Sequence, residues 1–402
     1  MKTIALAFRY LWSRPLAALL NLLLLTLGLA SITFVLLASE QIDRAFQRDL
    51  AGIDLVVGAK GSPMQLILAG VFHIDVPPGN IALADVEALR RQPQVAQLIP
   101  LSLGDSFRGF RIVGTNADYL AHYHLVPAQG GAWTGPLEAV LGANVARDTG
   151  MKAGNSFVGS HGLGGGGAGH AEHPYRVTGV LAPCGCVADR LILTATESVW
   201  EMHEMHAKPG AAHDDDAGHD AKHEVTMALI TYKSPMAAVT FPRYVNSSTG
   251  MQAAAPAIEV SRLLRMVGVG SEVLRGFGAV LLATAALSVF IALWTAVRER
   301  RADLAMLRML GAPPAKVAAL LLCEAWWLAL LAAILGLAGG HALAALVGAL
   351  LEAQRSLPMT GRLWVPAEAW IPVAAAAVAT VAALIPAVSA YRVDVAQLLN
   401  AR

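Results

Sequence analysis

The sequence contains little cysteine and no excess of charge of either sign. Only 3 of its 402 residues are cysteines, which excludes a small fold held together by a disulfide framework. Lys and Arg number 30 against 29 Asp and Glu, for a formal net charge of +1, so no basic field is available to bind nucleic acid. Charged residues form 15% of the chain and hydrophobic residues 55%, whereas soluble domains average about 25% charged residues. These proportions indicate a membrane protein with no nucleic-acid partner.

Recognisable catalytic motifs are also lacking. The run at 52–60 (GIDLVVGAK) is similar to a phosphate-binding loop, but Ala59 interrupts the required G-K step before Lys60, and no Ser or Thr follows the lysine. The run that starts at His203 has Ala207 where the zinc-protease motif H-E-x-x-H needs its second histidine. No serine lies in a G-x-S-x-G turn. We therefore predict a non-catalytic chain without cofactor-binding residues and without an ATP site.

Four apolar stretches are long enough to cross a bilayer as helices, which takes about 20 residues each. They cover residues 16–38, 276–297, 317–351 and 369–390. The first is too long for the apolar core of a cleaved signal peptide, so we expect it to remain as an anchor. The third is long for one span and contains Gly336, Gly339 and Gly340, which predicts a helix followed by a bend or a tilted extension.

Basic residues near the span ends orient the chain, because such residues stay on the cytoplasmic side. Lys2, Arg9 and Arg14 precede the first span, and the connection at 298–316 between the second and third spans is rich in arginine. Both termini are therefore expected inside. The long segment between the first and second spans is then outside, which predicts a multi-pass protein of the bacterial inner membrane with a large periplasmic domain.

The outer segment has the pattern of an α+β domain, because short alternating or apolar runs are separated by Gly and Pro. Strand-like runs lie at 95–103, 107–113, 175–181, 190–194 and 225–232, and helix-like runs lie at 83–91, 144–149 and 196–206. Thr194 and Glu197 have the spacing of a capping box for the last of these helices.

The predicted fold class is an α-helical membrane protein with four transmembrane helices and an α+β extracytoplasmic domain between helices 1 and 2. In chain order the expected segments are a cytoplasmic start with helix 1 (1–40), the outer domain (41–255), a stalk (256–275), helix 2 (276–297), a cytoplasmic coupling helix (298–316), helix 3 with its extension (317–351), an outer loop (352–368), and helix 4 with a cytoplasmic tail (369–402).

Histidines are concentrated in two parts of the outer domain, at 160–174 and 203–224. Neutral imidazole and carboxylate oxygen are ligands that Zn²⁺ accepts at neutral pH. We predict weak or multiple metal binding, with His161, His170, His173, His203, His206, His213, His219 and His223 as candidate ligands. The alternative is a solvated polar insertion whose histidines bind nothing.

Cys184 and Cys186 offer a second candidate metal site. Outside the cytoplasm these two cysteines can oxidise to a disulfide, or they can serve as thiolate ligands for Zn²⁺ or Cu(I). Plain buried cysteines in a turn are a third alternative, and the sequence leaves all three open.

The connection between the second and third spans is where we expect the chain to meet a partner. Its apolar residues predict a short amphipathic helix that Gly311 and the following prolines end. Such a helix can dock into a groove on a soluble protein or lie among lipid headgroups, and its closely alternating charges favour the protein. The candidate coupling residues are Arg298, Glu299, Arg301, Leu304, Leu307, Arg308 and Gly311.

One N-terminal span, a large outer domain, three C-terminal spans and the run RERRADLAMLRMLGAPPAKV at 298–317 occur together in this chain. In this combination the sequence resembles the FtsX-like permease family of ABC transporters, which includes the MacB-type exporters and the lipoprotein-releasing permeases. The stretches at 55–68, 141–155 and 383–399 are also similar to that family.

The resemblance implies a permease subunit that works as a dimer in the lipid membrane with a separate cytoplasmic ABC ATPase, where ATP is bound. Closure of the ATPase would be passed through the coupling helix and the stalk to the outer domains, a mechanism called mechanotransmission. The histidine-rich insertion departs from the family. It suggests zinc- or copper-linked export or lipoprotein handling, with a periplasmic metal-binding or outer-membrane partner.

Two other functions are consistent with parts of the sequence. A membrane-anchored periplasmic metal sensor or scaffold would use the histidines without an ATPase. A secondary metal transporter is disfavoured, because only Glu324 and His341 interrupt the spans, and such transporters need several polar ligands in the membrane. We interpret Glu324 as a structural residue near the membrane surface, since Trp326 and Trp327 follow it.

Overall fold

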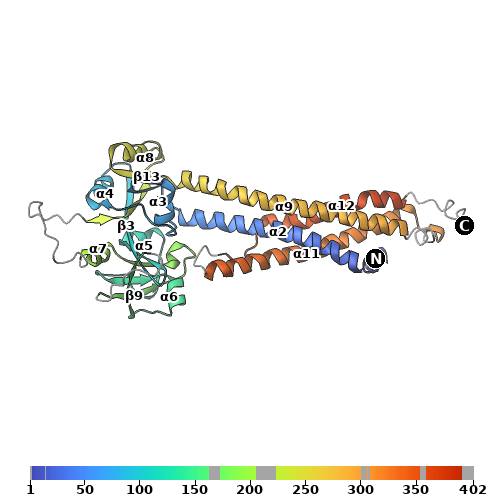
Figure 1. Cartoon of the computed structure of the whole chain (residues 1–402), viewed down its shortest axis with the longest axis horizontal. Helices are drawn as coiled ribbons and strands as arrows, with labels where there is room; N and C mark the ends of the chain where they lie inside the picture. Colours follow the sequence, from blue (N-terminus) through green and yellow to red (C-terminus); the bar gives the residue numbers. More distant parts are fainter. Residues whose placement is uncertain are drawn as a thin grey trace, which may run out of the picture. The chain divides into compact units, whose positions relative to one another are not determined.

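The computed structural model describes residues 2–13, 15–162, 173–204, 223–299, 306, 308–353 and 359–391 (Figure 1). The chain divides into two compact units. The first, which we call the membrane unit, comprises Met1–Arg44 and Met266–Arg402. The second, which we call the sheet unit, is Ala45–Arg265.

A mixed sheet of eleven strands forms the centre of the sheet unit. The strand order is β13-β1-β12-β3-β4-β10-β6-β9-β5, with β7 paired to β9 and β8 paired to β3, and β2 and β11 form a separate two-stranded sheet. The strands are β1 (Leu55–Ala59), β2 (Ile81–Ala82), β3 (Val95–Phe107), β4 (Phe110–Thr115), β5 (Pro127–Gly130), β6 (Glu138–Leu141), β7 (Ser156–Phe157), β8 (Ser160–His161), β9 (Tyr175–Leu181), β10 (Leu191–Ala195), β11 (Glu224–Val225), β12 (Met227–Tyr232) and β13 (Met251–Ala254). The β4–β10 and β6–β9 pairs are parallel.

Helices pack on this sheet in two groups. In Figure 1, α4 and α8 lie near β13, and α6 lies near β9. Two separate apolar cores correspond to these groups, one built around Leu55, Val86 and Phe241 and the other around Val145 and Tyr175. The helices of the sheet unit are α3 (Pro63–Gly70), α4 (Leu83–Arg90), α5 (Ala117–His122), α6 (Ala143–Thr149), the 3₁₀-helix η1 (Val187–Arg190), α7 (Thr196–Glu204) and α8 (Ala237–Ser248).

Strand β3 joins the two groups into one sheet. Its residues from Val95 to Leu101 pair with β12, whereas its residues from Ser102 to Phe107 pair with β4. The strand has 13 residues, about twice the usual length of a strand. A strand this long can lie in both halves of the sheet. The backbone hydrogen bonds of β3 to β12 and to β4 therefore align the two halves.

The predicted fold class is confirmed. In the part of the chain that the structure describes, four helices are long and apolar enough to span a membrane, and an α+β unit lies between the first and the second in the sequence. The strand predicted at 175–181 coincides with β9, and the helix predicted at 83–91 differs from α4 by one residue. The capping box is wrong. Thr194 lies inside β10, where its hydroxyl donates to the carbonyl oxygen of Glu138 (2.6 Å).

The membrane unit is built from long helices. They are α1 (Lys2–Leu11), α2 (Pro15–Asp49), α9 (Pro256–Glu299), α11 (Pro314–Ala353), the 3₁₀-helix η2 (Pro366–Ala369) and α12 (Trp370–Tyr391). The candidate spans within the described residues are Pro15–Asp49, Glu272–Glu299, Pro314–Leu351 and Pro366–Tyr391. Helices α2 and α9 begin or end in the sheet unit, since Asp49 and Pro256 belong to it.

The third span lies in one continuous helix, α11, with no break at its glycines. A bend or a tilt of this helix stays a prediction. The glycines allow α2 to approach closely. A Cβ atom on Gly336 would lie 2.6 Å from the Cβ atom of Leu29, and one on Gly340 would lie 2.4 Å from that of Thr33. Small residues of this kind let helix backbones pack tightly in a bilayer, where lipid removes the hydrophobic drive between helices.

Helix α1 was not predicted from the sequence, and it packs against α11. The Phe8 and Trp327 rings lie 5.2 Å apart in an edge-to-face arrangement. The indole nitrogen of Trp327 donates to the carbonyl oxygen of Ile4 (3.2 Å). These contacts explain why α1 forms although it is too short to be stable by itself in water.

We expect Gly340→Ala to destabilise the membrane unit, because the added methyl group would overlap the Thr33 side chain. Overpacking of this kind costs about 1–3 kcal/mol. Gly276→Ala in α9 is the matched control, since no atom lies within 4 Å of its added Cβ. Thermal unfolding of the full chain in detergent should show a lower midpoint for Gly340→Ala alone. Equal midpoints would contradict close packing between α2 and α11.

Candidate functional site at the end of helix α2 and at the cytoplasmic connection

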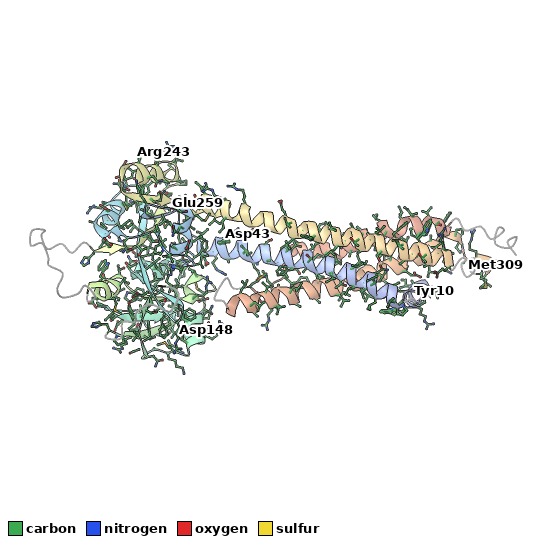
Figure 2. All side chains as sticks on the ribbon, in the orientation of Figure 1. Tyr10, Asp43, Asp148, Arg243, Glu259 and Met309 are labelled. Carbon is green, nitrogen blue, oxygen red and sulfur yellow. A yellow bond between two sulfur atoms is a disulfide. The ribbon has the colours of Figure 1, made fainter. Side chains whose placement is uncertain are left out.

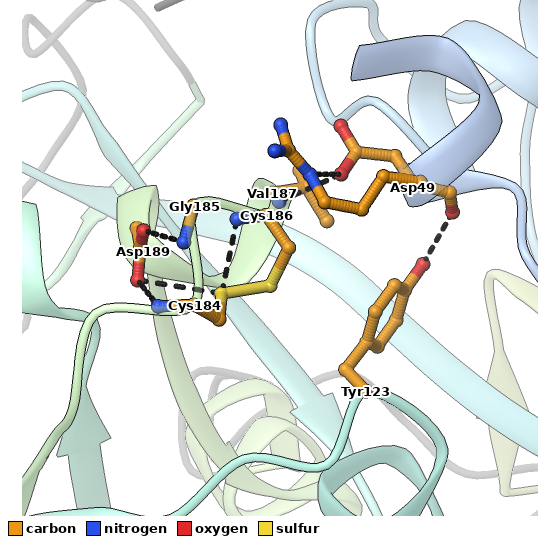
Figure 3. Close-up of polar contacts among 8 residues, drawn as sticks. Asp49, Tyr123, Cys184, Gly185, Cys186, Val187 and Asp189 are labelled. Atoms are coloured by element: carbon orange, nitrogen blue, oxygen red, sulfur yellow. Dashed lines mark hydrogen bonds and ion pairs between the residues drawn. A yellow bond between two sulfur atoms is a disulfide. The ribbon is translucent and has the colours of Figure 1, made fainter. Parts of the chain in front are cut away.

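Helix α2 ends at a buried carboxyl group inside the sheet unit. The Asp49 side chain is 3% exposed, and one of its oxygens accepts a hydrogen bond from the backbone N–H of Val187 (3.1 Å). The guanidinium of Arg48 lies 3.8 Å from the same oxygen. The backbone carbonyl of Asp49 accepts a hydrogen bond from the hydroxyl of Tyr123 (2.9 Å), as Figure 3 shows. We call these contacts of Asp49 with Val187, Arg48 and Tyr123 the Asp49 clamp.

The clamp satisfies polar groups that the end of a helix leaves open. The last carbonyl groups of an α-helix have no partner within the helix, and here Tyr123 from the segment after α5 supplies one. Val187 is the first residue of η1, which leads directly into β10. The end of α2 is therefore bonded to two separate parts of the sheet unit.

Cys184 and Cys186 form a disulfide beside the clamp. The backbone N–H groups of Cys184 (2.9 Å) and Gly185 (2.7 Å) donate to the two carboxylate oxygens of Asp189. The N–H of Cys186 donates to the sulfur of Cys184 (3.1 Å). Of the three alternatives left open by the sequence, the structure has the disulfide, so these sulfurs are not thiolate ligands here and a metal role would require their reduction.

Burial controls the protonation of the clamp. It raises the pKa of Asp49 to about 6, an effect that Arg48, the Val187 N–H and Arg190 oppose. Burial also lowers the pKa of Arg190. The neighbouring His73 is 7% exposed and its pKa is lowered well below the usual value, first by burial and then by the charges of Arg111 and Arg190. Asp49 is thus the clamp group that titrates near neutral pH.

The predicted histidine ligands are divided between the described residues and the rest of the chain. His170, His206, His213 and His219 lie outside the described residues. His161 ends β8, His203 lies in α7, and His173 and His223 lie just before β9 and β11. Among the residues that the structure describes, no group of three or more His, Cys, Asp or Glu side chains could hold a metal ion.

Residues in or next to the two histidine-rich segments bond to neighbouring residues of β3. Gly162, which precedes the undescribed part of the first segment, donates its N–H to the carbonyl oxygen of Gly104 (2.9 Å). Leu103, the residue before Gly104 in β3, donates its N–H to the hydroxyl of Thr226 (2.9 Å). Thr226 lies three residues after His223. Pairing with β3 therefore brings the start of one segment and the end of the other to neighbouring positions, which the sequence did not predict.

An aromatic contact fixes the end of the second segment. The rings of Trp200 and His223 are stacked with their centroids 4.2 Å apart. The indole nitrogen of Trp200 also donates to the carbonyl oxygen of Glu224 (2.6 Å). Trp200 lies in α7, so both ends of this segment are attached to the same helix.

The cytoplasmic connection is described only in part. Arg301, Leu304 and Leu307 lie outside the described residues. Arg298 and Glu299 are the exposed last residues of α9. Gly311 has a φ of 90°, and its N–H donates to the carbonyl oxygen of Arg308 (3.0 Å). This geometry confirms the predicted helix end at this glycine.

Apolar side chains are exposed at the end of this connection. Met306 is 53% exposed, Met309 56% and Leu310 86%. In Figure 2 the Met309 side chain extends away from the ribbon. Three exposed large apolar residues within five positions are typical of a surface that another protein or lipid covers.

Glu324 is buried within the membrane unit, with an exposed fraction of 4%. It lines a cavity of about 40 Å³ together with Tyr10 of α1 and Asn21 of α2. Asn21 in turn accepts a hydrogen bond from Ser288 of α9 (2.5 Å). The sequence did not indicate this polar cluster, because the cavity is closed by α1, a helix that was not predicted.

His341, the other polar residue of the spans, is hydrogen-bonded through both ring nitrogens. Its Nδ1 lies 2.8 Å from the carbonyl oxygen of Gly361, and its Nε2 lies 3.0 Å from the Glu368 carboxyl group. A carbonyl oxygen only accepts, so Nδ1 carries a proton and a second proton lies between His341 and Glu368. The pair thus holds the segment before α12 on α11.

Comparison with known sequences and structures gives a consistent result. The family described as MacB-like periplasmic core domain matches residues 18–223, and the family described as FtsX-like permease C-terminal matches residues 275–394. No curated protein matches the sequence.

Two solved structures are similar to about half of the chain. The periplasmic region of MacB from Actinobacillus actinomycetemcomitans is 12% identical, with a TM-score of 0.35 over 54% of this chain and 95% of that chain. The extracellular domain of the ABC-type transporter YknZ from Gram-positive bacteria is 13% identical, with a TM-score of 0.31 over 50% of this chain and 98% of that chain.

The raised pKa of Asp49 predicts a specific dependence of stability on pH. The folded chain holds the Asp49 proton up to about pH 6, whereas the unfolded chain releases it near pH 3.8. Stability should therefore fall as the pH rises from about 4 to about 6, by at most about 3 kcal/mol, and then level off. Asn at position 49 cannot ionise, so the Asp49→Asn variant lacks this loss of stability as the pH rises. The variant should unfold at a higher temperature than the wild type at pH 7.5 but not at pH 4.

Thermal unfolding of the full chain in detergent between pH 4 and pH 8 measures this difference. Asp49→Ala is the matched control, because it also removes the acceptor for Val187 and should be less stable than Asp49→Asn at every pH. Identical pH profiles for the wild type and Asp49→Asn would contradict the assignment.

Proposed function

Because the chain belongs to the FtsX-like permease family with a MacB-like periplasmic core domain, it is an ABC-transporter permease with a periplasmic domain, and we propose that it works by mechanotransmission. In this proposal a separate cytoplasmic ATPase hydrolyses ATP. The resulting movement passes through the membrane helices to the sheet unit, which acts on a cargo in the periplasm.

The Asp49 clamp is the observation that supports this proposal most directly. Helix α2 contains both a candidate membrane span and the clamp at its last residue. The clamp bonds that residue to Val187 before β10 and to Tyr123 after α5. A shift or rotation of α2 would thus be passed to two parts of the sheet unit through hydrogen bonds in a buried setting, where such bonds are strong.

The cytoplasmic connection is the proposed contact with the ATPase. Arg298, Glu299 and Arg308 bring charge, and Met309 and Leu310 bring exposed apolar surface. Apolar anchors surrounded by charged groups are typical of a protein interface. We infer that Arg301, Leu304 and Leu307 belong to the same contact, as the family resemblance implies.

We further propose that two copies of the chain assemble into a dimer in the bacterial inner membrane. The support for the dimer is the family resemblance, and the absence of a nucleotide-binding motif in this chain supports a separate ATPase. The chain itself is then a non-catalytic subunit, and the catalytic residues belong to the ATPase.

Metal binding by the two histidine-rich segments is the proposed link to the cargo. Hydrogen bonds to Gly104 and Leu103 bring the start of one segment next to the end of the other. Zn²⁺ takes up to four ligands, and two neighbouring segments can supply them together more readily than either alone. This arrangement supports zinc- or copper-linked export over lipoprotein handling, and it also suits the second candidate, a metal sensor without an ATPase.

The coupling proposal predicts the effect of a charge at the exposed end of the connection. Leu310→Asp should prevent capture of the ATP-binding subunit and reduce ATP hydrolysis of the reconstituted complex to that of the free ATPase, because an apolar anchor is replaced by a charge. Met236→Asp, at a residue of the sheet unit that is 73% exposed, is the matched control and should retain both. Co-purification and a phosphate-release assay measure the two effects. Normal coupling in Leu310→Asp would contradict this contact.

The metal proposal predicts binding that depends on both segments. Replacing His170 and His173 with alanine, or His213 and His219, should each reduce the heat released when ZnCl₂ is titrated into the full chain in detergent. Combining the four changes should abolish it. His124→Ala, outside both segments, is the control. Unchanged heat in the combined variant would contradict metal binding by these histidines. Neither metal transport nor metal sensing would then have support from them.

A further inference from the structure

We propose that the Cys184–Cys186 disulfide is a thiol–disulfide exchange site for a dithiol protein of the periplasm, and that its reduction loosens the Asp49 clamp. The exchange and the loosening stand on the structure of the sheet unit. A consequence for transport would rest in addition on the proposed function.

The disulfide is part of the short segment that presents Val187 to Asp49. Cys186 is the residue immediately before η1, and Val187 begins that helix. Because the second sulfur belongs to Cys184, the bond ties the backbone on both sides of Gly185. The direction of the Val187 N–H, and hence its bond to Asp49, therefore depends on a ring that contains only three residues.

The Asp189 carboxylate holds the first part of this segment, whereas the N–H of Cys186, next to Val187, has a weak acceptor. Gly185 has a φ of 65°, a conformation that glycine leaves easily. The N–H of Cys186 donates to the Cys184 sulfur, which is a poor acceptor. The Asp189 carboxylate holds the N–H groups of Cys184 and Gly185 but makes no such bond to Cys186 or Val187. Reduction would remove the covalent restraint closest to Val187.

The two sulfurs differ in access. Cys186 is 8% exposed, whereas Cys184 belongs to the partly exposed residues. An incoming thiolate therefore reaches the sulfur of Cys184. The guanidinium of Arg48 lies over the loop, with one nitrogen 3.4 Å from the position of a Cβ atom on Gly185. This positive charge favours a thiolate near the loop, and it acts against the Asp189 carboxylate, one oxygen of which lies 3.4 Å from the Cys184 sulfur.

The exchange is balanced with a dithiol reductant. A thiolate of the reductant attacks the Cys184 sulfur, a mixed disulfide forms, and the electron pair of the broken bond leaves on the Cys186 sulfur, which takes a proton from water. The second thiolate of the reductant then attacks its own sulfur in the mixed disulfide. This step forms the disulfide of the reductant and releases the Cys184 thiolate, which is protonated in turn. Two electrons have passed to the chain.

Val187 reports the mechanical consequence. In the disulfide form its amide hydrogen is held by a carboxyl group that is 3% exposed, so exchange with solvent hydrogen requires local opening. Once the ring is open, the residue before Val187 has lost its covalent cross-link to Cys184. We expect the Val187 amide to exchange at least tenfold faster in the reduced chain.

The full chain in detergent, with Cys323→Ala to remove the third cysteine, is the protein for the test. Dithiothreitol serves as the dithiol probe at pH 7.5, and a maleimide mass shift counts the free thiols. The proposal expects two thiols under conditions in which the intrinsic fluorescence of the folded chain is unchanged, together with faster exchange at Val187. A disulfide that is reduced only on unfolding, or that is reduced with unchanged exchange at Val187, would overturn it.

Single variants test the difference between the two sulfurs. Cys186→Ser leaves Cys184, which should form a mixed disulfide with a small aromatic disulfide at least tenfold faster than Cys186 does in Cys184→Ser. Equal rates would overturn the assignment of Cys184 as the attacked sulfur. Because these readouts do not involve ATP, they stand apart from the test of the coupling contact at Leu310.

Discussion

A buried carboxyl group at the end of a membrane helix is the interaction on which the functional arrangement of the chain depends. Asp49 ends α2 and is removed from water, which costs free energy for an ionised group. The Val187 N–H and Arg48 offset that cost, and Tyr123 satisfies the backbone carbonyl of the same residue. These partners come from separate parts of the sheet unit. The end of α2 can therefore not change its position without disturbing groups that are expensive to leave unpaired.

The same reasoning extends from Asp49 to the loop beside it. The N–H of Val187 points to Asp49 because the disulfide and the hydrogen bond from Gly185 to Asp189 fix the backbone conformation of the preceding segment. Strand β10 follows η1 directly in the chain and pairs in parallel with β4 near the centre of the sheet. Strand β4 pairs in turn with β3. A path of bonded elements thus leads from α2 to β3, which bonds to Gly162 and Thr226 beside the histidine-rich segments. We infer that this path connects the permease mechanism with the part of the domain that is unusual in composition.

Much of the architecture was predictable because it depends on local patterns. Spans follow from uninterrupted apolar runs, and β9 follows from alternation between turn residues. The candidate site was less predictable. Thr194 matched a capping pattern but lies in a strand, where Glu138 is its partner, and Gly336 and Gly340, which suggested a bend, lie against α2. A motif gives the possible partners of a residue, whereas the partner that it meets is set by elements distant in the chain.

The class of the protein follows from the sequence, because long apolar runs and sparse charge leave helices in a membrane as the physical solution. The end of the short helix in the cytoplasmic connection also follows from it, since Gly311 can adopt a positive φ. Tertiary structure alone decided that Asp49 is buried, that α1 covers Glu324, and that β3 aligns Gly162 with the residues near Thr226. Those features depend on contacts between residues far apart in the chain. Their free energies arise from burial and hydrogen bonding, and neither exists until the chain has folded.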